Sequence, residues 1–145
     1  MRPASIVMFE RLFLASLALS VVSFIIGYDA MSEQMANEPA LRQVGIGSGL
    51  MIGSMAVSLT IYLLLWFFIA RKASNVAKWI LVVFTALGIA SLAYAFATAG
   101  MAGDLNALLS LAYYALGVAA VVFLFKPDAE AWFKGEWKTD PSAFD

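Results

Sequence analysis

The sequence contains no cysteine and no histidine, and few other features narrow its chemistry as much. Without cysteine there are no disulfides, thiolate nucleophiles or cysteine-based metal sites, and the redox compartment stays open. Without histidine the chain lacks the commonest metal ligand and the commonest general base near neutral pH. We therefore expect no catalytic residues, no metal site and no cofactor, and we expect a protein that is not an enzyme.

Charge is also scarce, because charged residues make up only 13% of the chain, against about 25% in a typical soluble domain. The net charge is −1, so no basic field attracts nucleic acid, and we exclude nucleic acid as a partner. A phosphate-binding loop is missing as well. The glycines between Gly45 and Gly53 are not followed by the Lys-Ser/Thr pair that such a loop needs.

What the chain does have is apolar sequence, at 63% of its residues. A soluble core of this size cannot hide so much apolar surface, whereas a bilayer accepts it. A spanning helix needs about 20 mostly apolar residues, and strand-type alternation is absent. The sequence therefore predicts an all-α integral membrane four-helix bundle in one domain, 1–126, with an amphipathic tail at 127–145. Its antiparallel up-down spans fall at about 6–28, 44–70, 76–98 and 105–125.

The positions of the cations predict how the bundle is oriented. If the chain crosses four times, Arg42 is the only one of the nine cations that lies on the outer face. Cytoplasmic loops carry the excess of Lys and Arg, so we expect both termini in the cytoplasm and a location in the cytoplasmic (inner) membrane. One alternative stays open: the first span could be a cleaved signal peptide, with Ala30 and Ser32 near the cleavage point.

The connections carry readable helix signals. Asn37, followed by Glu38 and Pro39, is typical of the cap and first turn of the second helix. Ser74 or Asn75 is expected to cap the third helix. The acidic outer segment 29–43 is interpreted as a solvated loop, with a helical extension or a partner contact as alternatives.

The second span carries three glycines at four-residue spacing, Gly45, Gly49 and Gly53. Residues four apart share a helix face, and small residues allow two helix backbones to approach closely in a membrane. We interpret this glycine stripe as a helix-packing surface, either for another helix of the same chain or for a second subunit. A similar small face on the third span consists of Ala86, Ala90, Ala93 and Ala97.

The first span carries a matching stripe at steps of four, three and four: Ser16, Ser20, Ser23 and Gly27. The simplest expectation is that this serine stripe packs against the glycine stripe. The serines would otherwise line a path for water, although hydroxyls in spans commonly bond to their own backbone carbonyls.

Two further groups of residues are candidate site residues. Glu10 and Arg11 are the charges nearest to a span, and we interpret them as interfacial anchors that reach the headgroups. The alternative for Glu10 is a proton-coupled site. A weaker hypothesis brings Tyr94, Tyr113 and Tyr114 together around a ligand.

The tail is expected to form a short helix that begins at Asp128 and ends near Gly135. Trp132, Phe133 and Trp137 give this segment an apolar side, while its lysines and acids give it a polar side. Such a helix can lie in the membrane interface, or it can dock a partner protein.

These features favour a non-catalytic packing protein: an accessory or assembly subunit of a cytoplasmic-membrane complex. Its expected partners are membrane lipids and either another membrane protein or further copies of itself. The first alternative is a small homo-oligomeric transporter or channel for neutral or apolar solutes, since mid-membrane charges are missing. The second is a lipid- or quinone-binding membrane protein.

Overall fold

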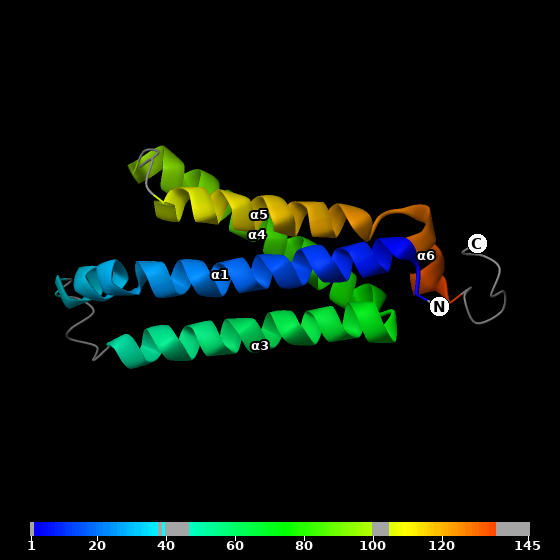
Figure 1. Cartoon of the computed structure of the whole chain (residues 1–145), viewed down its shortest axis with the longest axis horizontal. Helices are drawn as coiled ribbons and strands as arrows, with labels where there is room; N and C mark the ends of the chain where they lie inside the picture. The colour runs from blue at the N-terminus through cyan, green and yellow to red at the C-terminus, as the bar shows by residue number, and fades with distance from the viewer. Residues whose placement is uncertain (1, 38, 40–46, 100–104, 136–145) are drawn as a thin grey trace.

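The computed structural model describes residues 2–37, 39, 47–99 and 105–135 (Figure 1). These ranges contain helices and no strands, so the all-helical prediction is confirmed for them. The helices are α1 (Ala4–Asn37), α3 (Ser48–Lys72), α4 (Asn75–Ala99), α5 (Leu105–Phe123) and α6 (Pro127–Lys134).

The lengths and composition of these helices suit a membrane. α1, α3 and α4 are each long and apolar enough to cross one. α5 and α6 form a pair bent by 66°, and they add a fourth crossing if the pair counts as one span. At 1.5 Å per residue α5 alone is about 28 Å long, close to the ~30 Å of a hydrocarbon core. The protein thus has three to four helices of spanning character.

The outer segment differs from the prediction. α1 continues to Asn37, so the first part of the predicted loop is helical and the alternative of a helical extension is confirmed there. The physical reason is that residues 29–37 contain neither glycine nor proline, and mostly good helix formers. α1 ends at Asn37, and the predicted cap and first turn after it fall largely outside the described residues, so that cap stays a prediction. α3 begins later than expected, at Ser48 after Gly47, and residues 40–46 lie outside the described ranges.

Figure 1 shows α1 lying beside α5, and the two run in opposite directions. This pair has the most extensive contact between helices in the described structure, while α3 touches both α1 and α4, and α4 touches α5. The starts of α1 and α4 and the ends of α3 and α5 gather around α6. We call this the α6 end, and the opposite end the far end. Short connections predicted α3 beside α4, but they gave no signal for the dominant α1–α5 pair.

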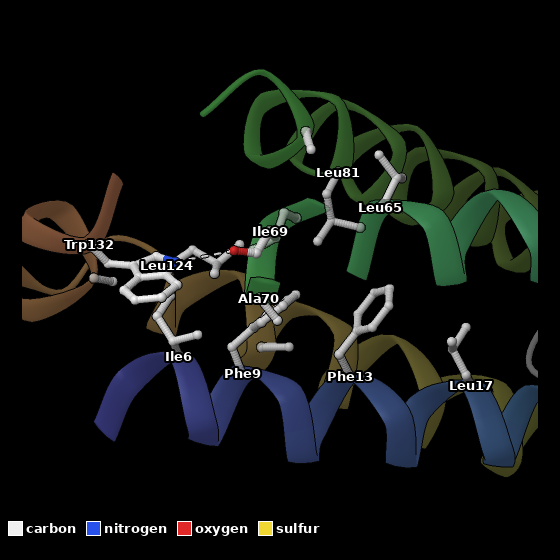
Figure 2. Close-up of a cluster of buried hydrophobic side chains, with 13 residues drawn as sticks. Ile6, Phe9, Phe13, Leu17, Leu65, Ile69, Ala70, Leu81, Leu124 and Trp132 are labelled. Atoms are coloured by element: carbon white, nitrogen blue, oxygen red, sulfur yellow. Dashed lines mark hydrogen bonds between the residues drawn. The ribbon is translucent and has the colours of Figure 1, made fainter. Parts of the chain in front are cut away.

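The hydrophobic core lies toward the α6 end (Figure 2). Every helix contributes to it, and the aromatic rings of α1 stack along it, with Phe9 and Phe13 at 5.3 Å between centroids. By contrast, none of the described residues of α4 beyond Leu81 is fully buried. The buried cluster comprises Ile6, Phe9, Phe13, Leu17, Leu65, Ile69, Ala70, Ala77, Leu81, Ala120, Leu124, Ala129 and Trp132.

The turn between α3 and α4 uses local backbone chemistry. Ala73 ends α3 in the left-handed region, with φ of 51°. The N–H groups of Ala73 and Ser74 both donate to the carbonyl of Phe68, which closes the helix end. Ser74 then accepts a hydrogen bond at its hydroxyl from the N–H of Ala77, at 3.3 Å. The prediction of a cap at Ser74 is therefore confirmed.

The tail helix lies where it was predicted and ends as predicted, but it begins at Pro127 instead of Asp128, with Lys126 as its N-cap and no side-chain capping bond. α6 begins with Pro127, whose missing N–H costs nothing at the first helical position. It ends at Gly135, which adopts φ of 78°, a value that favours glycine. Asp128 and Glu130 lie in its first turn and Lys134 in its last, as the helix dipole favours.

Candidate functional site

α6 is fastened to α3 through Trp132. Because the N–H of Ala73 donates to Phe68, the carbonyl of Ile69 lacks its usual partner four residues on. The indole Nε1 of Trp132 donates to this carbonyl at 3.3 Å (Figure 2). Trp132 is only 5% exposed and belongs to the core. Its ring therefore docks the tail within the chain, while its predicted position in the membrane interface stays a prediction.

The other two aromatic residues of the predicted tail surface have different outcomes. Phe133 is half-buried and packs against the same cluster. Trp137 lies outside the described residues. The apolar side of α6 thus faces the protein through Ala129 and Trp132.

A second fastening joins α6 to the start of α1. One carboxylate oxygen of Asp128 accepts the backbone N–H of Ser5 at 3.0 Å, and the other accepts the Ser5 hydroxyl at 2.7 Å. A helix start has N–H groups without intrahelical acceptors, so Asp128 caps α1 from 123 residues away. The pKa of Asp128 is raised by burial, but hydrogen bonds from Ser5 and from local backbone outweigh this and leave it below its ordinary value.

Glu10 is engaged at the same end. Its carboxylate pairs with Arg2 of the N-terminal segment, and its second oxygen lies 4.0 Å from Arg71 at the end of α3. Its side chain is 17% exposed, so the pairing is partly shielded from solvent. Arg11 is exposed. Glu10 thus links two chain segments through ion pairs, and its role as an interfacial anchor stays a prediction.

The serine stripe of α1 faces inward. Ser16 and Gly27 are buried, and Ser20 and Ser23 are half-buried. Ser16 donates to the carbonyl of Phe13 and Ser20 to that of Leu17, each three residues earlier. Because these hydroxyl protons stay on the helix's own backbone, the two serines serve close packing in an apolar setting.

The glycines of α3 do not meet that stripe. A Cβ built at Gly49 or Gly53 would have no described atom within 4 Å apart from its chain neighbours and the nearby backbone of α3 itself, and both glycines are exposed. The expected packing of the serine stripe against these two glycines is therefore wrong, since the main neighbour of α1 is α5. Gly45 lies outside the described residues. Among the residues that the structure describes, the glycine face of α3 has no partner from another helix.

Tyr62, Tyr113 and Tyr114 come together between the helices. Tyr94, which was predicted to join this group, is 72% exposed and lies apart from it. Tyr113 and Tyr114 of α5 contact each other at 4.8 Å between ring centroids, and Tyr62 of α3 interacts with both. Their rings line a cavity of about 50 Å³ together with Ser16 of α1. The cavity is lined mainly by apolar side chains with a few hydroxyls, and its volume has room for a few water molecules.

The cavity adjoins an open cleft between α3 and α4. The cleft has a volume of about 450 Å³ and shares Tyr62, Gly88 and Tyr114 with the cavity. Ser58 and Ser91 add hydroxyls to its wall. Tyr114 lies directly over Gly88, where a Cβ would be 2.7 Å from ring atom Cε1. An isolated glycine inside a helix often marks such a close approach, and this signal was available in the sequence.

The chemistry of these groups is that of hydrogen bonding. Hydroxyls of serine and tyrosine donate to and accept from neutral polar groups. No cluster of three or more acidic side chains that could hold a metal ion occurs within the part of the chain that the structure describes. The cavity and cleft can thus orient one polar group of an otherwise apolar molecule.

Comparisons with models of protein families, with curated proteins and with solved structures give no match for this chain.

Proposed function

We propose that this protein is a non-catalytic integral membrane protein that serves as an accessory or assembly subunit of a cytoplasmic-membrane complex. The single observation that carries this proposal is the exposed glycine face of α3, where Gly49 and Gly53 have no neighbour within 4 Å of a built Cβ. Small faces in membrane helices allow close backbone approach, and helix association there depends on packing. A face of this kind without an intrachain partner suits a helix of another subunit.

The direction of the small faces supports this proposal. At 100° per residue, Gly49 and Gly53 lie roughly 120–160° around α3 from the buried Met51, Leu65 and Ile69, and roughly 60–100° from the buried Ala70. α4 repeats the arrangement, since its four stripe alanines are all exposed and lie on the side opposite the buried Ala77 and Leu81. These alanines are Ala86, Ala90, Ala93 and Ala97. Both helices of the hairpin thus turn these two small stripes away from most of their buried residues.

The distribution of charge supports a four-span topology with both termini in the cytoplasm. The described cations lie at the starts of α1 and α4, at the ends of α3 and α5, and in α6, all of which gather at the α6 end. Under the positive-inside rule this end faces the cytoplasm. The cations are Arg2, Arg11, Arg71, Lys72, Lys78, Lys126 and Lys134.

The test starts from the particle that a mild detergent releases from native membranes, with the chain at its natural level. We expect stoichiometric co-migration with other membrane proteins, and we expect Gly49→Leu to abolish it. Because Gly49 and Gly53 have open space around them, a leucine there leaves the isolated chain folded and monodisperse. Ala115→Leu, at an exposed position of α5, is the matched control and should keep the partners.

A released particle that contains only this chain would contradict the accessory-subunit proposal. If both Gly49→Leu and Gly53→Leu keep the partners, the glycine face is not the surface that binds them. Loss of folding in Gly49→Leu would mean that the face packs within the chain after all.

A second candidate function is the binding of a lipid, a quinone or another largely apolar molecule with one polar group. The hydroxyl-lined cavity and the cleft that continues it favour this candidate. The test is extraction and mass analysis of small molecules that copurify with the chain. Tyr62→Phe keeps the ring and removes a hydroxyl, so it should reduce the bound amount, whereas Tyr94→Phe on the exposed surface should not.

A further inference from the structure

Lys78 is the one buried cation among the residues that the structure describes. Its residue is 7% exposed, although it lies only three positions into α4. Three aromatic rings surround its ammonium group: Nζ lies 4.8 Å from the ring centroid of Phe133, 4.9 Å from that of Phe125 and 5.8 Å from that of Trp79. The rings attract the positive charge through their faces, which helps to hold it at this position.

The ammonium of Lys78 has no oxygen acceptor among the described residues. The ion pairs in these ranges join Glu10 to Arg2 and Arg71, and Glu130 to Lys134. An ammonium carries three N–H donors, and aromatic faces compensate its charge without supplying an oxygen acceptor. A buried cation of this kind favours an incoming anion that supplies oxygen atoms.

The space for such an anion is next to the ammonium. Lys78 lines a pocket of about 270 Å³ between the start of α4 and α6, together with Asn75, Trp79, Phe133, Lys134 and Glu130. α4 begins at Asn75, so the positive end of its dipole and its first N–H groups lie at the pocket. Two lysines against one carboxylate leave the pocket with a net positive charge.

An apolar groove along α4 adjoins the pocket at Trp79. This groove, of about 430 Å³, shares Trp79 with the pocket and is lined by Val76, Ile80 and Val83. Trp79 is 53% exposed and Val76 70% exposed, so these side chains are open to an apolar partner. A positively charged pocket at the end of an apolar groove matches a headgroup phosphate joined to an acyl chain. A free anion would use the pocket and leave the groove empty.

We infer that the pocket between α4 and α6 binds the phosphate of an anionic phospholipid, with an acyl chain in the groove along α4. Lys78 and Lys134 contact phosphate oxygens, and the start of α4 supplies backbone donors. Glu130 opposes the anion and limits the affinity. This inference is independent of the partner subunit that the glycine face is proposed to bind.

The test uses the full chain in a neutral detergent, with lipid binding measured by native mass spectrometry and by thermal stabilisation. The probes are phosphatidylglycerol, phosphatidylcholine and inorganic phosphate. We expect phosphatidylglycerol to bind most tightly and inorganic phosphate to give no stabilisation at the same concentration. Lys78→Gln should weaken phosphatidylglycerol binding about tenfold, as expected for one charge-assisted contact.

Three further variants keep the test decisive. Lys134→Gln alters an exposed side chain and leaves the core intact, so its loss of binding cannot reflect misfolding. Glu130→Gln should strengthen binding, because it removes the opposing charge. Lys72→Gln, at an exposed cation near the end of α3, should leave binding unchanged.

Binding that is equal in the wild type, Lys78→Gln and Lys134→Gln would overturn the inference. Equal affinity for phosphatidylcholine and phosphatidylglycerol would show that the net charge of the lipid does not matter, and it would also overturn the inference. Stabilisation by inorganic phosphate alone would assign the pocket to a free anion instead of a lipid.

Discussion

Replacing Trp132 by phenylalanine tests whether the bond between its indole and the carbonyl of Ile69 holds α6 in place. The substitution keeps an aromatic ring in the core and removes the Nε1–H donor that lies 3.3 Å from this carbonyl. The carbonyl then has no donor, because the N–H of Ala73 is engaged with Phe68. A buried polar group without its partner costs about 1–3 kcal/mol, so we expect a loss of that size in the free energy of unfolding.

Trp132→Ala should cause a larger loss in the free energy of unfolding than Trp132→Phe. The ring is 95% buried, and removing a core tryptophan costs about 3–5 kcal/mol. The assay is unfolding of the purified chain in mixed micelles, followed by helicity. Limited proteolysis is a second readout, since undocking of α6 should expose residues 127–135 to cleavage before the spans unfold.

Trp66 supplies the matched control. It packs against the same cluster, but its buried Nε1 has no hydrogen-bond partner among the described residues. Trp66→Phe therefore removes ring volume without removing a hydrogen bond, and it should cost less than Trp132→Phe. Equal losses for the two variants would refute the role assigned to the bond with Ile69. Unchanged protease resistance in Trp132→Ala would refute the docking of α6 altogether.

Three more predictions concern single positions. Asp128→Ala should lower stability by about 0.5–2 kcal/mol, as for the loss of a helix cap. Hydrogen bonds hold the pKa of Asp128 in the folded protein below its ordinary 3.8. The stability that Asp128 contributes is therefore present above pH 3.8 and is lost as the pH falls through the lowered pKa. The unfolding curves of wild type and variant should converge in acid. Ala73→Gly should raise stability by about 0.5–1 kcal/mol, because φ of 51° strains alanine, and a lower melting temperature would contradict this. Gly88→Ala should cost about 1–3 kcal/mol through its clash with Tyr114, and a double-mutant cycle with Tyr114→Leu should show that the two changes are not additive.

The sequence predicted the elements of this protein well wherever local chemistry determines them. Ser74 caps α4 and Gly135 ends α6, because serine at an N-cap and glycine at a C-cap have strong backbone preferences. Apolar runs likewise predicted the long helices.

The sequence could not predict which helices pack against each other, and the reason is physical. A helix that is apolar nearly all round gives no stripe that marks its buried side. The small stripes of α1 and α3 looked equivalent, yet Ser16 is buried while Gly53 is exposed. In the same way Tyr62, and not Tyr94, lies with the tyrosines of α5. Sequence spacing predicts which residues share a face, whereas only the tertiary arrangement determines where that face points.

The two ends of the protein differ in how they are held, and this difference bears on the proposed partner. At the α6 end, Trp132, Asp128 and Glu10 each join segments distant in sequence through hydrogen bonds or ion pairs. Toward the far end, α4 has no fully buried residue after Leu81 within the described range. Regions with few buried contacts open at lower free energy, so amide exchange should be faster in the far halves of α3 and α4 than in their halves at the α6 end. A partner that covers the glycine face should slow that exchange selectively, because packing against α3 supplies the contacts that the isolated chain lacks.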